Sequence, residues 1–290
     1  MAAATVPGMN PAQAQATSMP ETVISPPGRW NWRIGPELWE YRDLLYFLTK
    51  RELQIRYKQS FFGVGWAVLQ PLALAFIFAL VFGTFIDAPS EEIPYPVFAV
   101  AGLVPWLFFS QAVMMGANSL VLDADLISKV YFPRIALPVA KALSLMVDLA
   151  ISFVVVLIVA LIYGVGISTN IWALAGFIPL GIVTTFALGS LLAAVNVKYR
   201  DVQLVMPMFV QVLLFVSPVV YPGSLVTGGW SYVYALNPMV TVLDGIRWAL
   251  FGTTSPGGVE ALISVASALV LLLLSLSYFQ RTERYFADVV

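Results

Sequence analysis

Long apolar runs, separated by short polar segments, fill the sequence from residue 66 onward. A bilayer core is about 30 Å thick, so roughly 20 apolar residues in a helix cross it. Six stretches reach this length and predict six transmembrane helices, at 66–86, 95–120, 142–167, 171–197, 202–221 and 259–279. We therefore expect an all-α integral membrane protein whose residues 66–290 form one six-span domain.

The distribution of basic residues separates the two sides of the predicted bundle. Every Lys and Arg except Arg247 lies before the first span, after the last span, or in the loops that join the second span to the third and the fourth to the fifth. The loop after the first span instead carries Asp87, Glu91 and Glu92. Cytoplasmic loops carry the excess of Lys and Arg. We therefore expect a multi-pass protein of the cytoplasmic (inner) membrane with both termini in the cytoplasm.

Residues 222–256 are apolar enough to suggest a seventh span, but they include Asn237-Pro238 and the charged Asp244 and Arg247. A seventh span would also place the basic C-terminal residues on the opposite side from the other basic loops. We therefore expect an outer re-entrant pair of half-helices that breaks at Asn237-Pro238. Asp244 and Arg247 then form a helical i,i+3 pair. The seventh span remains the alternative.

The chain begins with a segment of different composition. Residues 1–28 are rich in Ala, Pro, Ser and Gln and carry one charge, on Glu21. They lack the basic start and the apolar core of a signal peptide. Such a composition predicts a disordered N-terminal tail.

Residues 29–65 form the next predicted unit, a cytoplasmic interface segment. Within it, Leu38, Leu45 and Leu48 recur at helical spacing between charged residues. This pattern predicts an amphipathic helix at the membrane surface, with its apolar side in lipid and its basic residues near the headgroups of membrane lipids.

Composition excludes several classes of function. The chain is 60% hydrophobic and 11% charged, with a net charge of -1, so it lacks the basic face that nucleic-acid binding needs. It has no Cys and no His, which removes thiolate nucleophiles, Cys- or His-bound zinc and the commonest general base. We expect no catalytic residues, no metal site and no cofactor bound by this chain.

The source of energy must also lie outside the chain. No Gly-rich loop ending in Lys-Ser or Lys-Thr occurs, so ATP binding of the P-loop type is not expected here. Among ionisable residues only Asp148 lies well inside a predicted span. One buried carboxylate makes a poor proton relay. These features favour a transport protein that is driven by a partner.

The loop between the second and third spans is unusually charged for this protein. Asp123 and Asp125 stand at the start of a short predicted helix and Lys129 near its end, which is the order that the helix dipole favours. Pro133 then stops the helix. We expect the following residues to leave an exposed apolar surface: Val130, Tyr131, Phe132 and Ile135. A charged helix with an aromatic tip suits the groove of a soluble partner, although it could instead rest on the membrane surface.

Six segments carry a resemblance to a known family. In chain order they are LTKRELQIRYKQSFFGVGWAVLQPLALAFIFALVFG (48–83), AGLVPWLFFSQAV (101–113), ANSLVLDADLISKVYFPRIALPVAK (117–141), NVKYRDVQ (196–203), SPVVYPGSLV (217–226) and LNPMVTVLDGIRWALFG (236–252). Together they resemble the permease subunits of type-2 ABC exporters for polysaccharide, O-antigen or teichoic acid. The resemblance extends from about residue 38 to residue 252.

This resemblance implies a permease domain that forms a homodimer and pairs with two copies of a separate ATP-binding subunit. ATP and Mg, and the ATPase activity itself, would belong to that subunit. The loop at 123–135 would be a coupling helix seated in a groove of the ATPase, with the motif near 198–201 close to the same interface. The expected ATPase-coupling residues are Asp123, Asp125, Lys129, Tyr131, Phe132, Arg134, Lys198, Arg200 and Asp201.

The family also implies a lipid-linked glycan or polyol-phosphate as the exported substrate. Aromatic faces stack on sugar C–H surfaces while their edges offer polar contacts. The aromatic residues expected to line the substrate path are Trp106, Phe108, Phe109, Tyr221, Trp230, Tyr232 and Tyr234. An exporter of small lipids or drugs with the same architecture is the alternative. A membrane glycan-lipid transferase would need paired acid and base groups near a span end, and the sequence offers none.

Overall fold

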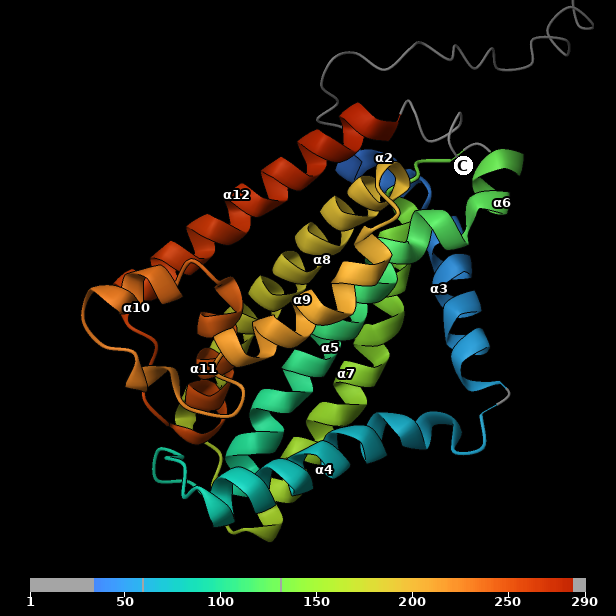
Figure 1. Cartoon of the computed structure of the whole chain (residues 1–290). Helices are drawn as coiled ribbons and strands as arrows, with labels where there is room; N and C mark the ends of the chain where they lie inside the picture. Colours follow the sequence, from blue (N-terminus) through green and yellow to red (C-terminus); the bar gives the residue numbers. More distant parts are fainter. Residues whose placement is uncertain (1–33, 59, 131, 284–290) are drawn as a thin grey trace, which may run out of the picture. The chain divides into compact units, whose positions relative to one another are not determined.

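The computed structural model of the protein describes residues 34–58, 60–130 and 132–283. All regular structure in these ranges is helical, which confirms the predicted all-α class for the described part of the chain (Figure 1). The predicted N-terminal tail at 1–28 and the predicted coupling residue Tyr131 lie outside the described residues.

Five helical segments are long and apolar enough to cross a membrane, and they coincide with five of the six predicted spans. They are Gly63–Phe85, Tyr95–Leu122 (α5), Ala136–Ile162 (α7), Thr169–Lys198 and Gly258–Glu283 (α12). The first comprises η1 (Gly63–Gly65), α4 (Trp66–Phe78) and the π-helical η2 (Ala79–Phe85). The fourth comprises η3 (Thr169–Ala173) and α8 (Leu174–Lys198). The protein is thus a multi-pass membrane protein.

The predicted fifth span, at 202–221, differs from the structure. Its helix, α9, covers only Val202–Val216, and 15 helical residues reach about 22 Å. Ser217 is extended, with φ -112° and ψ 151°. Pro218 follows it, and the residue before a proline is disfavoured in the helical region. The expectation of one continuous helix to residue 221 is therefore wrong.

The third predicted span also shifts along the chain. Its helix begins at Ala136 rather than at residue 142, so Lys141 lies inside α7 and is buried. The helix ends at Ile162, five residues before the predicted end. Gly164 follows with φ +71°, a left-handed conformation that ends helices and that glycine adopts without strain.

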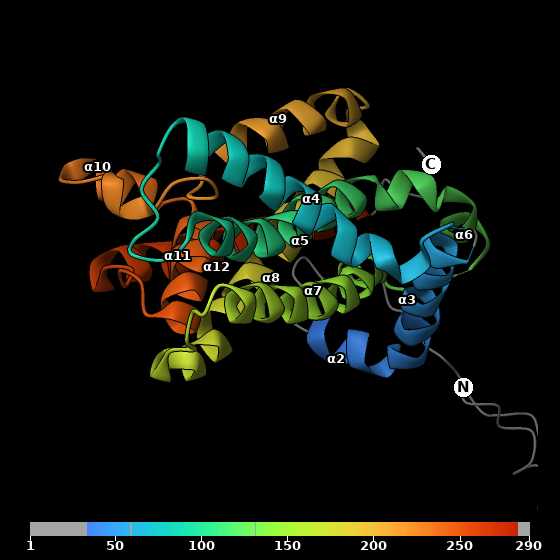
Figure 2. The same cartoon turned by 90° about the horizontal axis from the view of Figure 1, so that it is seen from below.

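Helix α5 is the most deeply enclosed of the spans. In the most apolar stretch of α5, 83% of the residues are buried, against 11% in the corresponding stretch of Gly63–Phe85. Helix α5 packs against α4, α7 and α8 (Figures 1 and 2). A Cβ placed on Gly116 would lie 3.3 Å from Cα of Gly189 in α8. The two backbones therefore cross in close contact, which small residues allow in membrane helix pairs.

The predicted interface helix is present, but it is divided. Helix α2 covers Ile34–Glu40 and α3 covers Arg42–Tyr57, with a turn at Tyr41. Leu48 is only 2% exposed and packs in an apolar cluster with Phe279 of α12. The expectation that the Leu48 side lies in lipid is wrong, because protein covers it. Trp39, Tyr46, Phe47 and Ile55 are the exposed apolar side chains of α2 and α3.

The region 222–256 forms short helices instead of one long helix. They are η4 (Gly223–Leu225), α10 (Gly229–Tyr234) and α11 (Pro238–Phe251). Asn237 caps α11, since its side-chain oxygen accepts a hydrogen bond of 3.1 Å from the Met239 amide. The predicted break at Asn237-Pro238 is confirmed, and a single continuous helix over this region does not form.

Arg247 fastens α11 to its neighbours. It is fully buried, lies 3.7 Å from the Phe98 ring centroid and donates hydrogen bonds to the carbonyls of Phe98, Pro218 and Val219. It also lies 3.4 Å from the Asp244 carboxylate, which confirms the predicted i,i+3 pair. The guanidinium thereby satisfies buried carbonyls that are left free where α9 ends.

Candidate functional site

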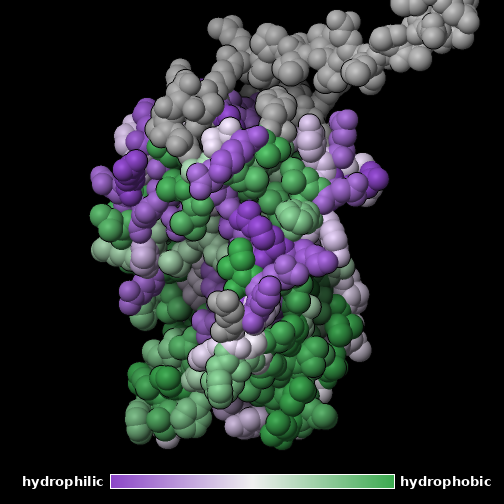
Figure 3. Space-filling model, turned by 90° about the vertical axis from the view of Figure 1, so that its right-hand side faces the viewer, coloured by the Kyte–Doolittle hydropathy of each residue, from purple (hydrophilic) through white to green (hydrophobic). Residues whose placement is uncertain are grey.

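Polar residues concentrate at one end of the helices. Figure 3 shows hydrophilic residues over the part of this face that holds α3 and α6, and hydrophobic residues over the opposite part. Helix α6 covers Ala124–Lys129 and lies between α5 and α7 in the chain. This end is the candidate functional site.

Helix α6 forms as its sequence predicts. Asp125 lies in its first turn and Lys129 in its last, and the final turn closes with a 3.1 Å bond from the Val130 amide to the Leu126 carbonyl. Val130 is already extended. Asp123 separates α5 from α6, but its carboxylate makes no cap hydrogen bond to the backbone of α6. It bonds with side chains of other helices instead.

Asp123 belongs to a group of four interlocked charges that we call the charged quartet: Arg51, Glu52, Asp123 and Lys141. The Lys141 ammonium lies 2.7 Å from a Glu52 oxygen and 3.1 Å from an Asp123 oxygen. Arg51 pairs with Asp123 and lies 3.3 Å from Glu52. The side chains of Glu52, Asp123 and Lys141 are each 8% exposed. Two positive and two negative groups thus neutralise one another and join α3, the base of α6 and α7.

The quartet sets the ionisation of Arg51. Burial lowers the pKa of this guanidinium, but the hydrogen bond and the charge of Asp123, followed by those of Glu52, raise it on balance. Arg51 therefore remains a cation within the quartet.

Sequence reasoning identified Asp123 but missed Arg51 and Glu52 as its partners. A usable signal was present for Glu52, which lies one helical turn after Leu48 and therefore on the buried side of α3. No sequence pattern indicates that Asp123 and Lys141, which flank a loop, meet at that side.

The predicted coupling residues of the α6 region fall into two groups. Asp125 and Lys129 are exposed, as a partner contact requires. Phe132 and Ile135 are each only 5% exposed, within the apolar cluster that also holds Ile127 and Leu48. The expectation that Phe132 and Ile135 form an exposed surface is wrong, because α3, α8 and α12 supply side chains that cover them.

Arg134 connects this region to the end of α12. Its amide donates a 3.3 Å hydrogen bond to a Glu283 side-chain oxygen, and its guanidinium donates to the Glu283 carbonyl. Arg134 is half-buried rather than free on the surface. Its placement predicts that α12 and the α6 region move together.

The second predicted coupling segment lies at the turn between α8 and α9, at the same end of the helices (Figure 1). Lys198, Arg200 and Asp201 are all exposed there. The Lys198 ammonium lies 5.2 Å from the centroid of the Tyr199 ring. The apolar cluster includes both Val197 of α8 and Ile127 of α6, so one core supports both exposed segments.

The aromatic residues predicted to line a substrate path do not form one surface. Trp106 and Phe109 are each 2% exposed inside the core, with ring centroids 5.2 Å apart. Phe108 of the same helix lines a pocket between α4 and α7. Trp230 and Tyr232 are exposed on α10, which is a different region.

Tyr221 and Tyr234 are the two members of this set that touch through their hydroxyl groups. The Tyr234 hydroxyl donates to that of Tyr221 over 3.2 Å, and the Tyr221 hydroxyl donates to the Phe215 carbonyl over 2.8 Å. Burial, and then the hydrogen bond with Tyr221, raise the pKa of Tyr234. Its hydroxyl therefore stays protonated and remains the donor of the bond to Tyr221.

A second polar connection lies where α3 approaches α7. Asp148, the carboxylate predicted inside a span, pairs with the Arg56 guanidinium and accepts a hydrogen bond from the Tyr57 hydroxyl. Burial, followed by the bond and charge of Asp148, raises the pKa of Tyr57 to about 12. Asp148 is thus a paired carboxylate, and across the described ranges no three acidic residues gather into a metal-binding group.

The fold and these contacts define the class as a multi-pass helical membrane protein with a charged end. The sequence pattern of the ABC-2 type transporter family matches residues 43–251. The chain belongs to this family, and the resemblance seen in the sequence is confirmed.

Named relatives match nearly the whole chain. The chain is 30% identical over 261 residues to the O-antigen export system permease protein RfbA of Myxococcus xanthus. The matched region covers 89% of this chain and 99% of that protein. It is 25% identical over 252 residues to the RfbA protein of Klebsiella pneumoniae, covering 86% and 95%. It is 26% identical over 238 residues to the polysialic acid transport protein KpsM of Escherichia coli, covering 81% and 92%.

Proposed function

We propose that this chain is the transmembrane subunit of an ABC transporter that exports a lipid-linked polysaccharide across the cytoplasmic membrane. ATP is hydrolysed on a separate subunit. The similarity to an O-antigen export permease along 89% of this chain carries the proposal. The match to a polysialic acid transport protein supports the same class of cargo.

The membrane topology of this proposal has six crossings, with α9 and the loop after it as the fifth. Short α9 completes its crossing as irregular backbone, supported by the carbonyl bonds of Arg247. Helices α10 and α11 then form the outer re-entrant pair, and both termini lie in the cytoplasm. The gathering of basic residues at the α6 end supports this orientation.

The coupling role falls to the exposed faces of α6 and the α8–α9 turn. Asp125, Lys129, Arg200 and Asp201 contact the ATP-binding subunit, and two copies of each subunit form the transporter. Asp123 does not contact the partner itself. It acts through the charged quartet, which fixes the base of α6 to α3 and α7. Movement of the partner is thereby passed to the transmembrane helices.

A deletion strain tests the export function. We expect loss of a surface polysaccharide, restored by the wild-type chain, and co-purification of the chain with an ATP-binding subunit. Unchanged surface polysaccharide would overturn the proposed substrate, and accumulation of a small lipid would point to the alternative class of cargo.

Charge reversal tests the coupling surface. Lys129→Glu should weaken retention of the ATP-binding subunit by about tenfold or more, since reversing an interfacial charge costs more than about 1.4 kcal/mol. Lys50→Glu, at an exposed position on α3, is the matched control and should retain the partner. Equal retention by both variants, at equal membrane abundance, would refute the coupling role of α6.

A further inference from the structure

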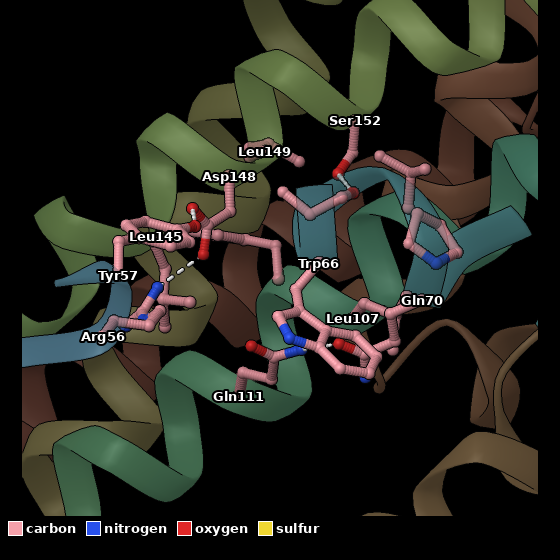
Figure 4. Close-up of a pocket in the computed structure, with 14 residues that line it drawn as sticks. Arg56, Tyr57, Trp66, Gln70, Leu107, Gln111, Leu145, Asp148, Leu149 and Ser152 are labelled. Atoms are coloured by element: carbon pink, nitrogen blue, oxygen red, sulfur yellow. Dashed lines mark hydrogen bonds and ion pairs between the residues drawn. The ribbon is translucent and has the colours of Figure 1, made fainter. Parts of the chain in front are cut away.

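A pocket of about 160 Å³ lies between the end of α3 and helices α4, α5 and α7, near the middle of α5 and α7. Figure 4 shows two polar groups on its wall: Arg56 with Asp148, and Gln70 with Gln111. The Trp66 side chain also lines it. None of these five residues belongs to the predicted substrate path.

The two glutamines are poorly suited to a lipid-facing surface. The Gln111 amide nitrogen donates to the Gln70 oxygen over 3.2 Å, and Gln70 is exposed on α4. This bond uses one donor and one acceptor of the pair, which leaves further amide donors and acceptors directed to the space around them. Polar groups within membrane spans face water-filled space or polar ligands rather than hydrocarbon. The pocket side of α4 therefore faces a polar environment.

The two charged side chains of the pocket neutralise each other, which favours a neutral ligand. Arg56 and Asp148 are paired, and their side chains are 22% and 17% exposed. The Tyr57 hydroxyl donates a hydrogen bond to the other carboxylate oxygen of Asp148. A phosphate would have to separate Arg56 from Asp148 and would then leave a half-buried carboxylate without its cation. Hydroxyl groups can instead bond to the free amide positions without breaking the ion pair.

Size and aromatic surface point to a sugar. The volume is well below the roughly 300–1,000 Å³ of pockets for drug-sized molecules, so one ring fits and a chain does not. Trp66 lines the pocket and is 48% exposed, and its ring lies at 81° to that of Phe62, with 5.3 Å between centroids. A half-exposed indole held in place offers its face to sugar C–H groups.

We propose that this pocket binds one neutral sugar unit of the exported glycan. The Gln70 and Gln111 amides bond to its hydroxyls, and the Trp66 indole packs against its ring. This site rests on the proposed export function and adds to it a contact for the glycan. The pocket lining also includes Phe108 of the predicted aromatic path.

Photocrosslinking in cells tests the site. Trp66 is replaced by p-benzoylphenylalanine in cells fed a radioactive sugar, and Trp39, exposed on α2, is replaced in the same way as the control. We expect sugar label on the chain after irradiation with the Trp66 variant and not with the Trp39 variant. In a strain that makes the carrier lipid but no glycan, fed radioactive phosphate, no labelled adduct should form. A phosphate-labelled adduct there would overturn the proposal in favour of headgroup binding.

Substitution of the amides provides the second measurement. Gln70→Leu and Gln111→Leu, each combined with the Trp66 crosslinker, should lower the yield of sugar-labelled adduct by about 2- to 10-fold, the loss of one hydrogen bond. Gln54→Leu, at an exposed position on α3 outside the pocket, should leave it unchanged. Equal yields in all three would refute the assigned role of the amides.

Export in the same cells separates the two levels of the proposal. If the crosslinker variant restores surface polysaccharide but gives no sugar-labelled adduct, the pocket assignment fails and the export function stands. If the deletion strain never lost its polysaccharide, the export function itself fails.

Discussion

Removal of Lys141 from the charged quartet should be among the most damaging single changes in the protein. The Lys141→Met substitution keeps much of the side-chain length and removes the charge. Lys141 lies 2.7 Å from Glu52 and 3.1 Å from Asp123, and at an effective dielectric constant near 20 each contact contributes about 5–6 kcal/mol of attraction. Desolvation of the buried ions opposes most of this. Loss of the lysine leaves two buried carboxylates with Arg51 alone, so we expect destabilisation of about 3–5 kcal/mol.

Thermal unfolding of the purified chain in detergent measures this effect. At about 2–4 °C per kcal/mol, the apparent Tm of Lys141→Met should fall by roughly 6–20 °C. Lys129→Met, the same substitution at an exposed position of α6, should stay within about 0.5 kcal/mol of wild type. The double variant Lys141→Met, Glu52→Gln should lose less stability than the sum of the losses in the two single variants, because Lys141 and Glu52 are then removed together and neither is left buried without the other. A Tm for Lys141→Met equal to that of Lys129→Met, or strict additivity in the double variant, would refute the reasoning.

Three further predictions, with five substitutions, test the packing of the fold by the same unfolding assay. Arg247→Met should destabilise the fold by about 3–5 kcal/mol, since buried carbonyls lose their donor. Gly102→Ala should also destabilise it, because the added methyl group would overlap the Arg247 guanidinium. Wild-type stability of both variants would contradict the role of the arginine. Phe132→Ala should destabilise the fold by about 3–5 kcal/mol and Val130→Ala by almost nothing, because Phe132 is buried and Val130 is exposed. The reverse order would show that Val130, and not Phe132, is the buried side chain after α6. Gly116→Ile should separate α5 from α8 and lower the Tm by several degrees, whereas an unchanged Tm would show that the close crossing is not needed.

Features that depend on local sequence could be predicted, and those that depend on distant neighbours could not. Helix α6 follows from its acidic start, its basic end and the proline after it, and the break before α11 follows from Asn237-Pro238. The exposure of Phe132 was mispredicted because the short segment after α6 does not reveal which of its side chains are covered. Leu48 and Phe279, which cover the same cluster, come from opposite ends of the chain.

Two errors at helix ends had signals in the sequence. The end of α9 at Val216 follows from Pro218, since the residue before a proline leaves the helical region. Gly164 likewise accounts for the early end of α7. In both cases an apolar run continues past the helix, so hydropathy alone overestimates its length.

The candidate site combines both kinds of information. The charged residues of the α6 loop are visible as a cluster in the sequence, but the partners of Asp123 lie on α3 and α7. Gln70 and Gln111 stand on separate spans, and only the packing of α4 against α5 brings their amides within 3.2 Å. Pairings across helices of this kind depend on rotation and depth, which the hydrophobic pattern specifies only loosely.

Export of a lipid-linked polysaccharide is tested most directly by mass spectrometry of lipid-linked glycans from the membranes of a strain depleted of this protein. We predict that a long glycan accumulates on its lipid carrier while the same polymer disappears from the cell surface, and that wild-type protein reverses both changes. Normal levels of lipid-linked glycan together with a normal cell surface would contradict the proposed function.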